Sequence, residues 1–225
     1  RIAQKIGIDK FNEFLNNIGI LTNISFDIDE TGETQIGRWG KCKLLTVGFG
    51  HGIATTLLQL SKGYAIISNG GFEISPTIIK RNNYKKGKRV LNPIVSEKLN
   101  PILRKIVSTE EGTASFADVK GYEIGGKTGT ADIASIGGYS KKKVNTFASI
   151  FPTSNPKFVL VVMLDEPKGT EQTHGFAYAG WNAAPTVAKV ISRIGPLLGV
   201  LPGNDSKDEN ANALLVSLRE GEVGG

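Results

Sequence analysis

Apolar residues recur at helical spacing in four stretches of the chain. In the first stretch Gly7 marks a break, after which Asp9 can cap a second helical piece and Gly19 can end it. Thr55 or Thr56 can open the second stretch, and Asn182 can cap the last. We therefore predict helices over about residues 2–18, 55–68, 96–108 and 183–194.

Three later runs have the composition of β-strands: residues 122–131, 145–151 and 157–164. The connections between them are too short for a helical crossover, so the three strands should form an antiparallel meander. Residues 20–45 predict a loop with short strands, and residues 72–92 an irregular hairpin around a basic turn. The expected fold class is α+β, with the meander packed against helices.

Composition excludes several classes of protein. The chain has 225 residues, of which 40% are apolar and 21% charged, as in ordinary globular domains. No apolar run approaches the roughly 20 residues of a membrane-spanning helix. With Cys42 as the single cysteine and two histidines, an internal disulfide is excluded, and we expect no metal and no cofactor.

Charge is mildly positive, with 27 basic and 21 acidic residues and a net charge of +6. The basic clusters 85–89 and 141–143 fall at predicted turns, and no aromatic residues interleave with them. Nucleic-acid binding needs such stacking residues, so we predict solvated turns and no nucleic-acid partner.

The segment Gly121–Ala131 carries the candidate chemistry, and two interpretations compete for it. By letter, Gly121 to Thr128 satisfies the phosphate-loop pattern G-x-x-x-x-G-K-T. A phosphate loop must follow a buried strand and open a helix. Here the preceding residues are polar and Gly129 stands where the first helical turn would be, so this interpretation is disfavoured.

The second interpretation places Lys127-Thr128-Gly129-Thr130 on a strand. Alternation sends Lys127 and Gly129 to one face and the two threonines to the other. A lysine charge, a glycine that lets a ligand backbone approach and a threonine hydroxyl together suit an anionic peptide end. A plain edge hairpin with a surface lysine is the alternative.

Three blocks resemble one family. They are Thr46-Val-Gly-Phe-Gly-His-Gly through Ser68-Asn-Gly-Gly71, Gly112-Thr-Ala through Lys127-Thr-Gly-Thr-Ala131, and Ala179-Gly-Trp-Asn-Ala-Ala-Pro185. In order and spacing they resemble the C-terminal part of the transpeptidase domain of class B penicillin-binding proteins, the septal D,D-transpeptidases. Leu57, where the family usually has proline, is a local departure. We expect residues 1–202 to be that portion of the domain and 203–225 a flexible polar tail.

This resemblance implies a partial penicillin-binding, serine β-lactamase-like transpeptidase fold and serine acyl transfer between peptidoglycan stem peptides during septal wall synthesis. It implies that Lys127 and Thr130 act in catalysis, the latter through its backbone N–H as an oxyanion donor. Thr128, Gly129 and Thr130 would bind substrate ending in D-Ala-D-Ala, or β-lactams. Further implied partners are membrane proteins of the divisome, at the periplasmic face of the inner membrane.

Two family motifs lack a credible counterpart. Ser-x-Asn does not occur, and the Ser-x-x-Lys matches at Ser140 and Ser154 fall in predicted turns after the Lys-Thr-Gly strand. We therefore expect a fragment, inactive alone, whose strand 158–164 has an open edge. The alternative is a non-catalytic binding module with this fold. Trp39 and Trp181 are predicted to pack, and His174 is a weaker candidate for the rim of the cleft.

Overall fold

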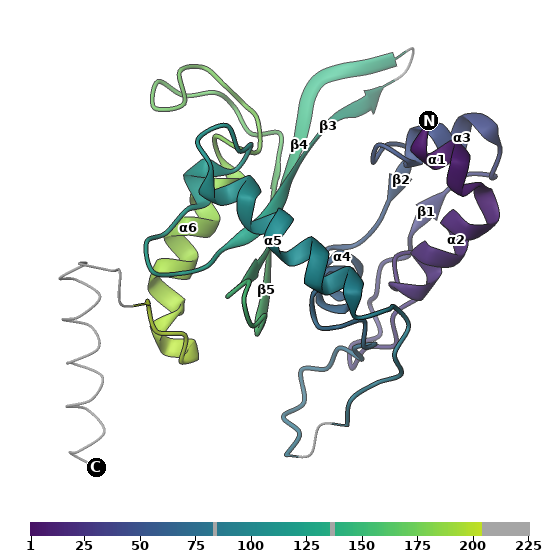
Figure 1. The fold of residues 1–225 in the computed structure, drawn as a ribbon. Coiled ribbons are helices and arrows are strands. Elements are labelled where there is room, and N and C mark those ends of the chain that lie inside the picture. Colours follow the sequence, from purple (N-terminus) through teal and green to yellow (C-terminus); the bar gives the residue numbers. More distant parts are fainter. Residues whose placement is uncertain (83–84, 136–137, 204–225) are drawn as a thin grey trace. The chain divides into compact units, whose positions relative to one another are not determined.

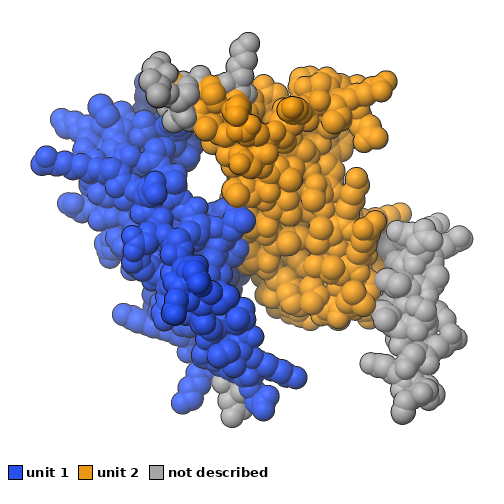
Figure 2. Space-filling model, turned by 180° about the vertical axis from the view of Figure 1, so that it is seen from behind, with its two compact units in different colours: residues 1–99 blue, residues 100–225 orange. Residues whose placement is uncertain are grey.

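The computed structural model describes residues 1–82, 85–135 and 138–203. The chain divides into two compact units, residues 1–99 and 100–225, which Figure 2 shows in different colours. Figure 1 traces the elements of each. The predicted extents 1–202 and 203–225 stay predictions, and residues 204–225 lie outside the described part.

The first unit begins with two short helices, α1 (Ile2–Ile6) and α2 (Ile8–Asn17). Gly7 separates them with a φ of 82°, a conformation that glycine adopts easily. The predicted break is therefore confirmed. Asp9 is not the cap; it lies in the first turn of α2, where a carboxylate favours the helix dipole.

Residues 20–54 contain more helix than the pattern predicted. Strands β1 (Gln35–Ile36) and β2 (Ile53–Ala54) form a two-residue antiparallel pair. Between them lies α3 (Lys41–Val47), which buries only Leu44 and Val47. Two buried positions in seven residues are too few for a periodic signal, so the pattern did not predict this helix.

Helix α4 (Leu57–Ser68) starts as expected. The hydroxyl of Thr56 accepts from the Gln59 amide, and the Gln59 side chain accepts from the Thr56 amide, which makes a capping box. Gln59 is fully buried and donates to the carbonyl of Thr22 at 2.9 Å, so the cap also ties α4 to the preceding loop. Ile66 of α4 packs on Ile18 and Ile20.

Residues 72–92 form an irregular hairpin, as predicted, with one isolated antiparallel bridge between Phe72 and Arg89. Helix α5 (Ile94–Ser108) follows and contains Pro101 in its interior. The helix therefore begins before the predicted start near residue 96, and it runs through the proline.

The second unit is built on a three-stranded antiparallel sheet of order β3-β4-β5: β3 (Gly125–Ser135), β4 (Gly138–Phe151) and β5 (Phe158–Asp165). The predicted meander is confirmed, but its first two strands are longer than expected. Residues 141–143 lie on β4 and not in a turn, because the ladder continues past Thr130 and pairs Asp132 with Lys143.

Helix α6 (Ala183–Ile194) packs on one face of the sheet (Figure 1), and the 3-10 turns η1 (Ser115–Ala117) and η2 (Pro196–Leu198) complete the unit. Asn182 caps α6, as predicted, by accepting from the Ala183 amide at 2.7 Å. The core under α6 is fully buried: Ile124, Phe147, Phe151, Val187 and Ile191.

Strand β5 is an edge of this sheet in the part of the chain that the structure describes. It pairs with β4 from Val144↔Asp165 to Phe151↔Phe158 and with no further described strand. The expected open edge at residues 158–164 is thus present. Strand β3, which carries the candidate site, forms the opposite edge.

Candidate active site

The Lys-Thr-Gly-Thr motif lies in the middle of β3. Lys127 pairs with Ala148 of β4, and Thr130 pairs with Asn145. The strand runs on to Ser135, so no helix follows the lysine. A phosphate loop needs a helix N-terminus at this point, and the strand therefore excludes that interpretation of the motif.

The three glycines of this strand have different roles. A Cβ on Gly125 would lie 2.5 Å from Thr153 Cγ2, and one on Gly126 would collide with the Ala148 carbonyl, so packing requires both glycines. A Cβ on Gly129 would meet only Thr146, at 3.9 Å or more. The fold of this chain leaves open space beside Gly129.

Polar contacts join Thr128 to its neighbours on both sides. Its hydroxyl donates to the hydroxyl of Thr113 at 3.0 Å. The Lys127 ammonium donates to the Thr128 carbonyl at 2.9 Å and to the Thr128 hydroxyl at 3.2 Å. Thr113 belongs to the Gly112-Thr-Ala block, for which no role at the site was predicted.

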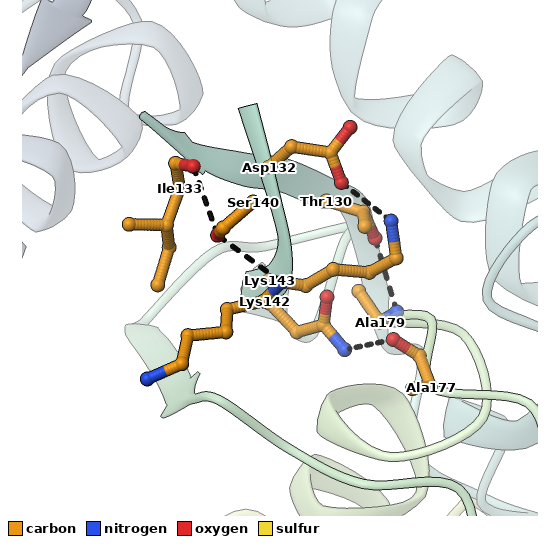
Figure 3. Close-up of polar contacts among 9 residues, drawn as sticks. Thr130, Asp132, Ile133, Ser140, Lys142, Lys143, Ala177 and Ala179 are labelled. Atoms are coloured by element: carbon orange, nitrogen blue, oxygen red, sulfur yellow. Dashed lines mark hydrogen bonds and ion pairs between the residues drawn. The ribbon is translucent and has the colours of Figure 1, made fainter. Parts of the chain in front are cut away.

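Thr130 contacts the segment that leads into α6. Its hydroxyl accepts from the Ala179 amide at 3.1 Å (Figure 3). Asn145, its partner across the ladder, is fully buried and donates to the Ala177 carbonyl at 2.9 Å and to Asn182 at 3.1 Å. Two residues of the sheet thus hold the entry to α6 against the motif.

A cavity of about 510 Å³ opens between β3, η1 and the segment before α6. Thr128 and Thr130 both line it, whereas Lys127 and Gly129 do not. The alternation predicted for the strand therefore holds, with the two threonines on the cavity side. The other lining residues are Glu110, Gly112, Thr113, Ser115, Phe116, Tyr178, Gly180 and Trp181.

Aromatic rings form one wall of this cavity. The ring of Trp181 lies 4.9 Å from that of Phe116 and 5.2 Å from that of Phe176, between ring centroids. Trp181 packs, as predicted, but it packs at the site. His174 places the edge of its ring against Trp181 at 5.8 Å, with a left-handed φ of 51°. Phe116 and Phe176 carried no signal in the sequence.

Ion pairs flank the far end of the strand. Lys143 of β4 contacts Asp132 of β3, and Lys142 lies 2.8 Å from Glu166 (Figure 3 shows the first pair). The hydrogen bond with Asp132 raises the pKa of Lys143, and the hydrogen bond with Glu166 raises the pKa of Lys142. Both lysines stay charged, and they stabilise the ladder locally.

Neither literal Ser-x-x-Lys match has the setting of a nucleophile. Ser140 lies on β4, and its hydroxyl donates to the Ile133 carbonyl at 3.0 Å. Ser154 lies in the turn before β5, where its amide donates to Glu123 at 3.0 Å. Neither residue starts a helix. Among the described residues no group of three His, Cys, Asp or Glu side chains could hold a metal ion, and no helix could span a membrane.

Comparison with known proteins gives the family. The family model "Penicillin binding protein transpeptidase domain" matches residues 1–192. The probable peptidoglycan D,D-transpeptidase FtsI of Caulobacter vibrioides is 33% identical over 211 residues, which cover 88% of this chain and 36% of that protein. The penicillin-binding protein PbpB of Mycolicibacterium smegmatis is 30% identical, covering 85% and 32%. The chain spans about a third of the length of these relatives.

Solved structures share the fold. The transpeptidase domain of penicillin-binding protein 3 from Burkholderia pseudomallei aligns with a TM-score of 0.80 and 27% identity, over 90% of this chain and 61% of that one. Penicillin-binding protein 3 of Mycobacterium tuberculosis, complexed with ampicillin, aligns with a TM-score of 0.78 and 24% identity, over 92% and 49%. The chain therefore belongs to the penicillin-binding protein transpeptidase domain family, as its three sequence blocks predicted.

Proposed function

We propose that this chain is part of a peptidoglycan D,D-transpeptidase that cross-links stem peptides during septal wall synthesis. One observation carries the proposal. In a chain of this family, the two threonines of Lys-Thr-Gly-Thr line a single cavity beside an edge strand. The relatives named as peptidoglycan D,D-transpeptidases support the reaction class.

Thr130 is proposed to bind the terminal carboxylate of the stem peptide. Its oxygen already accepts from the Ala179 amide, so its O–H proton remains able to donate. Along an edge strand of an antiparallel sheet, every second N–H points away from the ladder. The Thr130 N–H is assigned as one oxyanion donor, a role typically worth about 3 kcal/mol.

The other three roles are those that the family resemblance implies. Lys127 supplies a positive field and donates to the serine of the second family motif. Gly129 leaves room for the substrate backbone, in agreement with the open space beside it. Thr128 is a lesser contact or a structural one, since its hydroxyl is engaged with Thr113.

The reaction is acyl transfer in two steps. A serine hydroxyl, supplied by a part of the parent protein outside these 225 residues, attacks the carbonyl between the two terminal D-alanines. Its proton passes to the departing amine, and D-alanine leaves. An amine of a second stem peptide then attacks the ester, forms the cross-link and returns the proton to the serine.

The same strand is proposed to bind β-lactams, since the neighbour from Mycobacterium tuberculosis was solved with ampicillin and with aztreonam. The site is proposed to act at the periplasmic face of the inner membrane, with divisome membrane proteins as partners. A non-catalytic binding module with the same fold is the second candidate. The two unsuitable Ser-x-x-Lys matches favour it for this chain in isolation.

The test is turnover by the full-length parent protein. Incubated with a stem pentapeptide that ends in D-Ala-D-Ala, and with an acceptor amine, the parent should release D-alanine and form the new amide, both measured by mass spectrometry. A non-catalytic module would bind the pentapeptide and release no D-alanine. That result, with a folded protein, would overturn the proposal.

A further inference from the structure

One segment concentrates the whole excess charge of the chain. Six basic residues lie between positions 80 and 89: Lys80, Arg81, Lys85, Lys86, Lys88 and Arg89. The rest of the chain is balanced, with as many basic as acidic residues. From residue 74 to residue 92 there is no Asp or Glu. We call the exposed side chains of these six residues the basic hairpin.

The basic hairpin is built to stay exposed. All six cations are solvent-exposed, and none forms an ion pair within the part of the chain that the structure describes. Lys86 and Arg89 lie over the ring of Phe72, at 4.1 and 4.3 Å from its centroid. Contact with this ring orients two of the charges without neutralising them.

Two large apolar side chains stand beside these charges. Ile78 is 67% exposed and Ile79 is 59% exposed. Asp27 fixes the backbone at this point, since its carboxylate accepts from the Thr77 hydroxyl at 2.6 Å and from the Ile78 amide at 2.9 Å. These hydrogen bonds lower the pKa of Asp27, so the anchor is ionised at neutral pH.

Ile79 shares a surface with two of the cations. Ile79, Arg81 and Lys85 line the same cavity of about 410 Å³, together with Glu73, Ser75, Thr77 and Gly87. The one acidic residue among them, Glu73, is paired with Lys62. In Figure 1 the hairpin between α4 and α5 projects beyond the helices of its own unit. Cations that surround exposed apolar side chains are the pattern of a protein surface that adsorbs to an anionic bilayer, where the charges meet phosphate headgroups and the apolar groups enter the interface.

We propose that the basic hairpin, with Ile78 and Ile79, is a docking surface for an anionic phospholipid bilayer. Ordinary solvation of a turn does not explain why an otherwise balanced chain places its net charge in the segment that directly follows two exposed isoleucines. An acidic protein or a nucleic acid would use the charges alone. The isoleucines distinguish a bilayer from these partners. The proposal is independent of the transpeptidase reaction.

The test is sedimentation of the purified 225-residue chain with vesicles of phosphatidylcholine alone or mixed equally with phosphatidylglycerol. Binding should need the anionic lipid and fall steeply with salt. Replacing Lys80, Arg81, Lys85 and Lys86 with Gln should weaken binding at least about a hundredfold, since each cation near such a surface contributes on the order of 1 kcal/mol. The matched control replaces Lys5, Lys10, Lys105 and Lys120 with Gln, removes the same charge and should change binding little.

A second variant tests the apolar part. Ile78→Ser with Ile79→Ser keeps every charge and should weaken vesicle binding about tenfold. Circular dichroism confirms that each variant is folded. The proposal is overturned if vesicles of phosphatidylcholine alone bind equally well, if the control variant loses as much binding as the hairpin variant, or if the isoleucine variant binds like the parent chain.

Discussion

At Thr130, one hydroxyl group serves both the fold and the proposed chemistry. It accepts from the Ala179 amide and keeps its proton for a ligand carboxylate. Thr130→Ser preserves both functions and should acylate with a β-lactam at close to the parent rate. Thr130→Val removes the hydroxyl but keeps the backbone N–H, so the acylation rate of the full-length parent should fall about tenfold to a hundredfold.

Stopped-flow acylation kinetics separate binding of the β-lactam from the chemical step. The loss in Thr130→Val should appear mainly in binding, because the oxyanion donor survives. If Thr130→Ser falls as far as Thr130→Val, the hydroxyl is not the binding group.

Asn145 has a structural role that its sequence context does not indicate. It is an unremarkable polar residue in a β-type run, yet it is fully buried and joins β4 to Ala177 and Asn182. Asn145→Ala should lower the free energy of unfolding by about 2–3 kcal/mol, because two part-buried acceptors, on Ala177 and Asn182, lose the donor that the buried Asn145 supplies. Asn155→Ala, at an exposed position, should change it by less than about 0.5 kcal/mol. Urea unfolding measures both, and equal values would show that the buried contacts add nothing.

At the scale of elements, helix α4 contains Tyr64, a tyrosine whose pKa is raised. Burial raises the pKa of Tyr64 to about 12, whereas an unfolded tyrosine titrates near about 10. The folded state therefore holds this proton longer than the unfolded state. Its contribution to stability is complete below about pH 10 and is lost as the pH rises toward 12.

Ultraviolet absorption of phenolate tests this titration. The Tyr64 phenol should ionise about two pH units above an unfolded tyrosine, and this late step should be absent in Tyr64→Phe. A Tyr64→Phe variant with an unchanged titration curve would contradict the assignment.

Strand β5 presents an apolar open edge in the described sheet, and such edges promote aggregation. Met163 is 47% exposed, whereas Leu160 packs against the core under α6. Met163→Lys should reduce aggregation of the isolated chain, measured by light scattering, and leave its circular dichroism unchanged. Leu160→Lys should unfold the second unit. Equal aggregation of Met163→Lys and the parent chain would show that a surface other than the β5 edge causes aggregation.

The helices that sequence pattern predicted best are those with several buried positions, α4 and α6. Helix α3 was missed because it buries only two side chains. The extensions of β3 and β4 were missed because cross-strand ion pairs, and not apolar alternation, support them. For the same reason, the prediction of a turn at residues 141–143 is wrong.

For the molecule as a whole, local periodicity gave an α+β chain with a meander but no chemistry. The residues of the motif Lys127–Thr130 indicate a binding site only once they are known to lie on an edge strand, with the two threonines lining a cavity. Phe116 and Trp181, which line that cavity, meet through folding from distant positions, and Phe176 stacks on Trp181. Their contacts with one another could not be inferred from sequence spacing. Family resemblance supplied the function class, and the family model confirms the family.

Covalent labelling with a fluorescent penicillin, read after denaturation, directly tests the claim that the Lys127–Thr130 strand belongs to a transpeptidase active site. The full-length parent should be labelled, and Lys127→Ala should slow labelling at least about a hundredfold, because the variant loses the charge proposed to act at the reacting centre. Lys157→Ala, an exposed lysine before β5, should label at the parent rate, and the 225-residue chain alone should take no label. Labelling of Lys127→Ala at the parent rate, or label retained on the chain alone, would contradict the account.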